Sequence, residues 1–160
     1  MTDAVVHKKR IYILDDEVIT VRRLVHALSK DGYELEGFVT AAEAIARISK
    51  DAPDLLITDV RLGDANGVEV LQQVKGMAPQ TMVILMTGYA SIDQAVQAIK
   101  IGAFNYIAKP FRLDDLRQVI RDALQSTSHV GLTVDQTMNS PYRFGAVSYT
   151  HLTLPTNREV

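Results

Sequence analysis

The stretch Met82-Val83-Ile84-Leu85-Met86-Thr87-Gly88 decides the fold of this 160-residue chain. Five consecutive apolar residues, followed by a hydroxyl residue and a glycine, are typical of a strand that is buried on both faces of a parallel sheet. Four further short runs have the same character, at residues 11–14, 35–39, 55–58 and 106–108. Helices must cover both faces of such a sheet, so helical patterns are expected between the runs.

Apolar residues do recur at helical spacing between and after these runs. The helical patterns cover residues 18–28, 41–48, 68–74, 92–99 and 113–124. Thr40 and Ser91 stand where two of the helices should begin, and Gly32 and Gly102 where two should end. Strict alternation of strand and helix predicts an α/β, flavodoxin-like, doubly wound fold with a five-stranded parallel sheet in the order 2-1-3-4-5.

The composition of the chain argues against several classes of protein. The formal net charge is −2, which argues against a large nucleic-acid surface on this chain. There is no cysteine, so disulfides and thiolate metal sites are excluded. No apolar run approaches membrane-spanning length and no signal peptide precedes the first strand, so we expect a cytoplasmic protein that binds no membrane.

Polar residues follow four of the predicted strands. They are Asp15, Asp16 and Glu17 after the first strand, Asp59 at the end of the third, Thr87 at the end of the fourth, and Lys109 with Pro110 after the fifth. In sheets of this kind, ligands bind outside the carboxyl ends of the strands. We therefore expect these groups to converge at one edge of the sheet.

Three clustered carboxylates would repel one another in a partly desolvated cleft, and a bound cation would remove that repulsion. Oxygen ligands indicate a hard ion, and few ligands with room for water favour Mg²⁺ over Ca²⁺. An Asp beside Mg²⁺ can attack phosphorus and form an aspartyl phosphate. That reaction depends on positioning and charge neutralisation, which Lys109 and the Thr87 hydroxyl would supply to the phosphoryl oxygens.

Four motifs in this order resemble the response-regulator receiver family of two-component signalling. They are Ile13-Leu14-Asp15-Asp16-Glu17, Thr58-Asp59-Val60-Arg61-Leu62, Met86-Thr87-Gly88-Tyr89-Ala90 and Ala108-Lys109-Pro110-Phe111. The resemblance covers residues 10–125. It implies a phosphorelay protein that takes a phosphoryl group from a sensor histidine kinase and has no enzyme activity beyond its own phosphorylation and dephosphorylation.

The resemblance also implies a role for each matching residue. Asp59 would be the phosphoacceptor, with Thr87 and Lys109 as its catalytic partners. Mg²⁺ would be held by Asp15, Asp16, Asp59 and the backbone carbonyl of Arg61. Thr87 and Tyr106 would form the switch, and the Lys109–Pro110 peptide bond would be cis. Arg61 and Tyr89 occupy the positions that influence phosphate loss, and their bulk predicts a phosphoryl group that lasts minutes or more.

The sequence departs from the family after the phosphoacceptor, where Leu62 replaces a common methionine and Gly63 a common proline. We expect Gly63 to loosen the loop that leads to the third helix. The switch is expected to act on the face formed by residues 92–99, 106–108 and 113–124, through which a homodimer would form.

Other interpretations of the same residues remain open. Asp15 and Asp16 could cap a helix, Thr87 could cap a strand end, and Tyr106 could be a half-buried core aromatic. A haloacid-dehalogenase-like phosphatase would also use a strand-end Asp and Mg²⁺, but it requires Asp-x-Asp after its first strand. A flavin-binding module would require a Ser/Thr/Gly-rich phosphate loop where this chain has three acidic residues.

The chain is expected to divide into four segments. Residues 1–9 form an extension, 10–125 the receiver domain and 126–146 a linker rich in turn-forming residues. Residues 147–160 resemble the translation of a sequencing-library transposase adapter, which predicts an artefact and an output domain missing beyond residue 146.

Residues 86–96 and 102–111 resemble receivers of NtrC- and FixJ-type transcription regulators. Residues 141–145 are similar to the lead-in of a sigma-54-activating AAA+ domain. A sigma-54-type activator is therefore expected, and the alternative is a stand-alone or FixJ/LuxR-type receiver.

Overall fold

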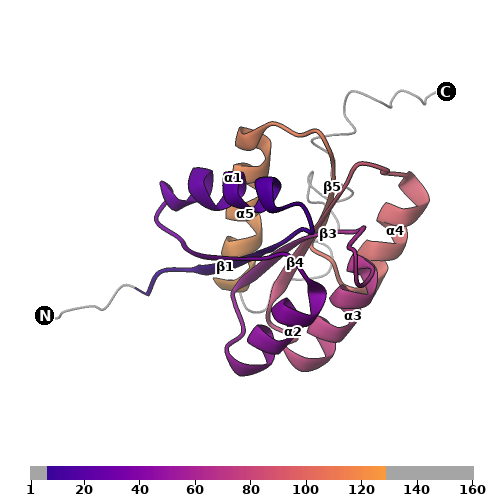
Figure 1. Cartoon of the computed structure of the whole chain (residues 1–160), viewed down its shortest axis with the longest axis horizontal. Helices are drawn as coiled ribbons and strands as arrows, with labels where there is room; N and C mark the ends of the chain where they lie inside the picture. The colour runs from indigo at the N-terminus through magenta and orange to yellow at the C-terminus, as the bar shows by residue number, and fades with distance from the viewer. Residues whose placement is uncertain (1–6, 129–160) are drawn as a thin grey trace, which may run out of the picture.

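Five parallel strands form one sheet in the order β2-β1-β3-β4-β5 (Figure 1). A computed structural model describes residues 7–128 of the chain. The elements are β1 (Arg10–Leu14), α1 (Val18–Ser29), β2 (Glu34–Phe38), α2 (Ala41–Lys50), β3 (Leu55–Asp59), α3 (Gly67–Met77), β4 (Met82–Thr87), α4 (Ile92–Ile101), β5 (Asn105–Ala108) and α5 (Leu113–Ser128). The predicted flavodoxin-like fold and its strand order are confirmed.

The strands are held in a register that brings their carboxyl ends to one edge. Leu14 pairs with Thr58 across β1 and β3, and Asp59 pairs with Met86 across β3 and β4. Thr87 pairs with Ala108 across β4 and β5. The residues that follow these positions are therefore neighbours in space, although up to about ninety residues separate them in sequence.

Helices cover both faces of the sheet, with α1 and α5 on one side and α2, α3 and α4 on the other (Figure 1). Successive side chains of β1 point to opposite faces, so Ile11 and Ile13 pack with α1 and α5 while Tyr12 and Leu14 pack on the other side. β3 is buried along its whole length because both of its faces are covered.

Two helices show which of their residues face the core. In α3 the buried face contains Val70, whereas Val68 is only partly buried. In α4 the buried residues are Ala95 and Ala98, and Ile92 is 64% exposed. Small alanines therefore form the face of α4 that packs on the sheet.

The residues expected at the helix ends lie where the sequence predicts them. Thr40 Oγ1 accepts the Glu43 N–H at 3.2 Å and Ser91 Oγ accepts the Gln94 N–H at 3.1 Å. Gly32 and Gly102 have φ of +87° and +129°, a region that favours glycine, just after α1 and at the end of α4.

Two further features concern the chain outside the sheet. α5 runs to Ser128, past the domain boundary expected at residue 125. The rest of the expected linker, the 147–160 tail and most of the N-terminal extension lie outside the described residues. Among residues 7–128, no helix has the length and apolar character that crossing a membrane requires.

Candidate functional site

Three carboxylates converge at the carboxyl edge of the sheet. Asp15 and Asp16 follow β1, and Asp59 ends β3. One oxygen from each of the three carboxylates lies within 4.8 Å of the others. Asp15 is 1% exposed and Asp59 is 9% exposed, whereas Asp16 lies at the open side of the cluster. Asp15 Oδ1 accepts the N–H of Glu17 at 2.9 Å, which fixes its side chain at the start of α1.

Lys109 enters this cluster from the end of β5. Its Nζ lies 2.9 Å from Asp15 Oδ2 and 3.0 Å from Asp59 Oδ2. Burial alone would lower the pKa of Lys109, but the hydrogen bonds to the two carboxylates outweigh it and the pKa is raised. The ammonium group therefore stays charged at neutral pH. The Lys109 N–H also donates to the Thr87 carbonyl at 2.7 Å, and the Lys109–Pro110 peptide bond is cis.

The cluster keeps an excess of negative charge even with Lys109 present. The pKa of Asp16 is raised, first by burial and then by the charges of Asp15 and Asp59. A divalent cation would relieve this repulsion. Three clustered carboxylate oxygens without nitrogen or sulfur ligands fit a hard ion such as Mg²⁺.

Thr87 lies at the end of β4 and is 1% exposed. Its Oγ1 accepts the N–H of Tyr89 at 3.0 Å, so the hydroxyl is part of the turn that leaves the strand. The Arg61 guanidinium stacks on the Tyr89 ring, 3.7 Å from the ring centroid. The Arg61 N–H donates to Asp59 Oδ1 at 3.3 Å. The residues Asp59, Arg61, Thr87 and Tyr89 are therefore linked by short contacts.

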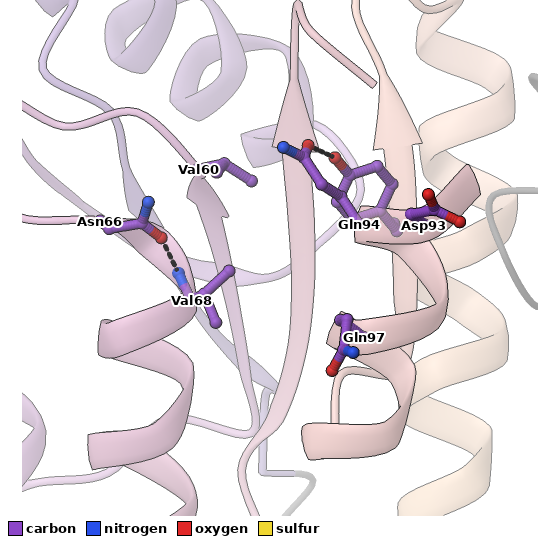
Figure 2. A pocket seen from close by; sticks show the side chains of 7 residues that line it. Val60, Asn66, Val68, Asp93, Gln94 and Gln97 are labelled. Atoms are coloured by element: carbon purple, nitrogen blue, oxygen red, sulfur yellow. Dashed lines mark hydrogen bonds between the residues drawn. The ribbon is translucent and has the colours of Figure 1, made fainter. Parts of the chain in front are cut away.

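Tyr106 is 1% exposed and so is fully buried, not half-buried. Its hydroxyl donates to Gln94 Oε1 of α4 at 2.8 Å (Figure 2). Both residues line a cavity of about 210 Å³, together with Val60, Asn66, Val68, Asp93 and Gln97. Gln94 carries no signal in the sequence, because only the packing of α4 on β5 brings it to Tyr106.

Sequence reasoning also missed how the loop after Asp59 is shaped. Asn66 caps α3 in a capping box with Glu69, a pattern that the Asn66-x-x-Glu69 spacing could have indicated. A Cβ at Gly67 would overlap the Asp59 carbonyl oxygen and lie 2.8 Å from the Val60 Cα. Only glycine lets α3 begin so close to the site. Asp64 turns toward α2, a contact that nothing local predicts.

Comparison with known proteins finds the same family that the four sequence motifs resemble. Residues 11–121 match the family model of the response regulator receiver domain. The acid tolerance regulatory protein ActR of Sinorhizobium medicae is 38% identical over 108 residues, which are 68% of this chain and 56% of ActR. Regulatory protein AtoC of Escherichia coli is 36% identical over 119 residues, which are 74% of this chain and 26% of AtoC.

The chain thus aligns with about half of one curated relative and a quarter of the other. Among solved structures, the beryllofluoride-activated NtrC4 receiver domain dimer superposes with a TM-score of 0.71 and 31% identity, over 74% of this chain and 98% of that one. Residues 11–121, which the family model matches, contain all five strands except the first residue of β1, together with the carboxylate cluster at the edge of the sheet. This chain therefore belongs to the response regulator receiver domain family of two-component signalling.

Proposed function

We propose that Asp59 accepts a phosphoryl group from a sensor histidine kinase. As a receiver domain, the chain is not a conventional enzyme, and its family implies a histidine kinase as partner. The observation that carries the proposal is the position of Lys109 Nζ, which contacts Asp59 and Asp15 at once. A cation held against the acceptor carboxylate is what phosphoryl transfer to that carboxylate requires.

In the proposed phosphoryl transfer, each side chain of the cluster has its own role. An Asp59 carboxylate oxygen forms a bond to phosphorus while the bond from phosphorus to the donor nitrogen breaks, and the donor imidazole leaves. The Lys109 ammonium then turns part of its interaction toward the phosphoryl oxygens. Asp15, Asp16, Asp59 and the carbonyl of Arg61 would hold Mg²⁺, which when bound neutralises negative charge on carboxylate and phosphoryl oxygens.

Phosphorylation would be detected by incubating the chain with acetyl phosphate and Mg²⁺. We expect one phosphoryl adduct by intact mass, labile to base and stable to acid, that peptide mapping assigns to Asp59. Asp59→Asn should abolish it, and Asp93→Asn, an exposed acid in the first turn of α4, should not. An adduct of equal yield in Asp59→Asn, or none in the folded wild-type chain, would contradict the proposal.

We further propose that Thr87 and Tyr106 transmit phosphorylation to the face formed by α4, β5 and α5. The Thr87 hydroxyl would leave the Tyr89 N–H and bond a phosphoryl oxygen. Tyr106 is already buried, so it would respond by changing its hydrogen bond to Gln94 of α4 and not by entering from solvent. Thr87→Ala should accept phosphate without the spectral changes in α4 that the wild type shows by NMR. Equal changes in both would refute this role.

The output that this face controls is proposed from the resemblance to NtrC-type receivers. A sigma-54-type transcription activator is the favoured whole protein, with its output domain outside this chain, and a stand-alone or FixJ/LuxR-type receiver is the alternative. The NtrC4 receiver domain was solved as an activated dimer, and a homodimer through α4, β5 and α5 is proposed here. Sedimentation of the chain with and without beryllofluoride tests it: a monomer under both conditions would exclude the activated dimer.

A further inference from the structure

Asp64 lies in the loop between β3 and α3 and contacts a different element, the beginning of α2. Its Oδ1 accepts the N–H of Ala41 at 3.0 Å, and its Oδ2 accepts the N–H of Ala42 at 3.1 Å. These are the first two residues of α2. Both oxygens of one carboxylate are therefore used on a helix N-terminus, where the unpaired N–H groups and the helix dipole favour negative charge.

The third N–H group of this helix is paired locally. Thr40 Oγ1 accepts the Glu43 N–H at 3.2 Å. The regular helical bonds begin at Ala44, whose N–H donates to the Thr40 carbonyl at 3.2 Å. The N–H groups of the first three helical residues, which have no acceptor within the helix ladder, therefore all have side-chain acceptors. Thr40 provides one of them from within the same segment, and Asp64 provides the other two from 22 and 23 residues further along the chain.

The loop that carries Asp64 is held at its base as well. The Gly67 N–H donates to the Val60 carbonyl at 2.6 Å, and the Leu62 N–H donates to the Ala65 carbonyl at 3.1 Å. Arg61 and Asn66 face each other as an antiparallel bridge between these contacts. The loop is thus a small closed turn whose base lies at Val60 and Gly67, next to Asp59, and whose tip is anchored to α2. This anchoring opposes the loosening that Gly63 was expected to cause.

We propose that Asp64 is a positioning residue for Mg²⁺ binding, acting by holding Arg61 in place beside the carboxylate cluster. The inference rests on the proposed function, in which the carbonyl of Arg61 is a metal ligand. A ligand carbonyl on a free loop would have to be ordered when the metal binds, at a cost in conformational entropy. Anchoring the tip of the loop removes part of that cost before the metal arrives.

The test is Mg²⁺ affinity, measured by NMR titration of the full chain. Asp64→Ala should raise the Kd about tenfold, the lower end of the losses seen when groups that orient metal ligands are removed. Asp64→Asn keeps one acceptor oxygen and should fall between Asp64→Ala and wild type. Thr40→Ala is the matched control, because it also removes a hydrogen bond from the start of α2 but leaves the loop anchored. Its Kd should equal that of wild type.

Two further readouts separate positioning from mere helix capping. The Leu62 amide should exchange with solvent faster in Asp64→Ala than in Thr40→Ala. Phosphorylation of Asp64→Ala by acetyl phosphate should be slow at low Mg²⁺ and should recover to the wild-type rate at saturating Mg²⁺.

Equal Kd values in Asp64→Ala and Thr40→Ala would overturn the inference and leave Asp64 as a helix cap. If Asp64→Ala does not fold, Asp64→Asn decides, and a wild-type Kd in that variant has the same meaning. A wild-type chain that binds no Mg²⁺ would instead overturn the proposed function itself.

Discussion

The Arg61 guanidinium lies over the ring of Tyr89, 3.7 Å from its centroid, and joins the loop after β3 to the loop after β4. Each residue stands two positions beyond a residue of the proposed chemistry, Asp59 and Thr87. Tyr89 is 64% exposed, so the stack lies on the surface beside the cluster. A cation–π contact at an exposed site contributes roughly 0.5–1 kcal/mol, enough to keep the two side chains together for most of the time.

The first prediction concerns the lifetime of the phosphoryl group. Arg61→Ala and Tyr89→Ala should each shorten it several-fold, because the stack limits the approach of water to the aspartyl phosphate. Since the two side chains act as one unit, the double variant should lose little more than either single variant. Decay of the phosphorylated species on Phos-tag gels would measure this. Tyr89→Phe keeps the ring and should keep the wild-type lifetime, whereas independent effects in the double variant would argue against a shared barrier.

Mg²⁺ and Asp16 should have opposing effects on stability. The pKa of Asp16 is raised first by burial and then by the charges of Asp15 and Asp59, so its ionised form is destabilised in the cluster. Asp16→Asn should therefore melt at a higher temperature than wild type in EDTA. Mg²⁺ should stabilise wild type more than Asp16→Asn. The free energy of unfolding of wild type should rise by about 2.7 kcal/mol when the free ion is at a hundred times its Kd.

Thermal unfolding by circular dichroism, with and without Mg²⁺, checks the Asp16 prediction. Glu17→Gln is the matched control, because it removes the same charge one residue further along. Its carboxylate accepts the Thr20 hydroxyl instead of joining the cluster. Equal Mg²⁺ stabilisation of Asp16→Asn and wild type would rule out Asp16 as a ligand.

Gly67 and Gly76 lie in the same helix and should respond oppositely to alanine. A methyl group at Gly67 would overlap the Asp59 carbonyl, so Gly67→Ala should destabilise the fold by about 1–3 kcal/mol. It should also weaken phosphorylation, because Asp59 must shift. Nothing lies within 4 Å of a Cβ at Gly76, and Gly76→Ala should stabilise α3 by about 0.5–1 kcal/mol. Urea unfolding of the two variants measures the difference, and a neutral Gly67→Ala would show that α3 can move away.

The contact of Tyr106 with Gln94 should show as coupling between the two side chains. Gln94→Leu removes the acceptor of a buried hydroxyl and should cost about 1 kcal/mol of stability. The double variant Gln94→Leu, Tyr106→Phe should lose less stability than the sum of the two single variants, because each single substitution already removes the same hydrogen bond. Chemical unfolding of the four species gives the coupling energy. Gln97→Leu, on the same cavity, should add independently to Tyr106→Phe. Additive losses for Gln94 and Tyr106 would mean that their hydrogen bond contributes no stability.

The local sequence pattern predicts the fold class for two reasons. Buried parallel strands appear in the sequence as short apolar runs. Strict alternation of strands with helices leaves few possible topologies. The same reasoning located the candidate site. In a parallel sheet the strand ends share an edge, so Asp15, Asp59, Thr87 and Lys109 had to approach one another wherever the helices packed. Neither inference needed to know a single side-chain contact.

Contacts between distant segments depended on packing that no local pattern encodes. Asp64 reaches α2 because α2 and α3 lie side by side, and Gln94 meets Tyr106 because α4 packs on β5 through its alanines. The order of residues along the chain is enough to predict each strand and helix, and the edge of the sheet at which each strand ends. The orientation of each helix and the partner of each polar side chain follow from minimising the free energy of the whole packed domain.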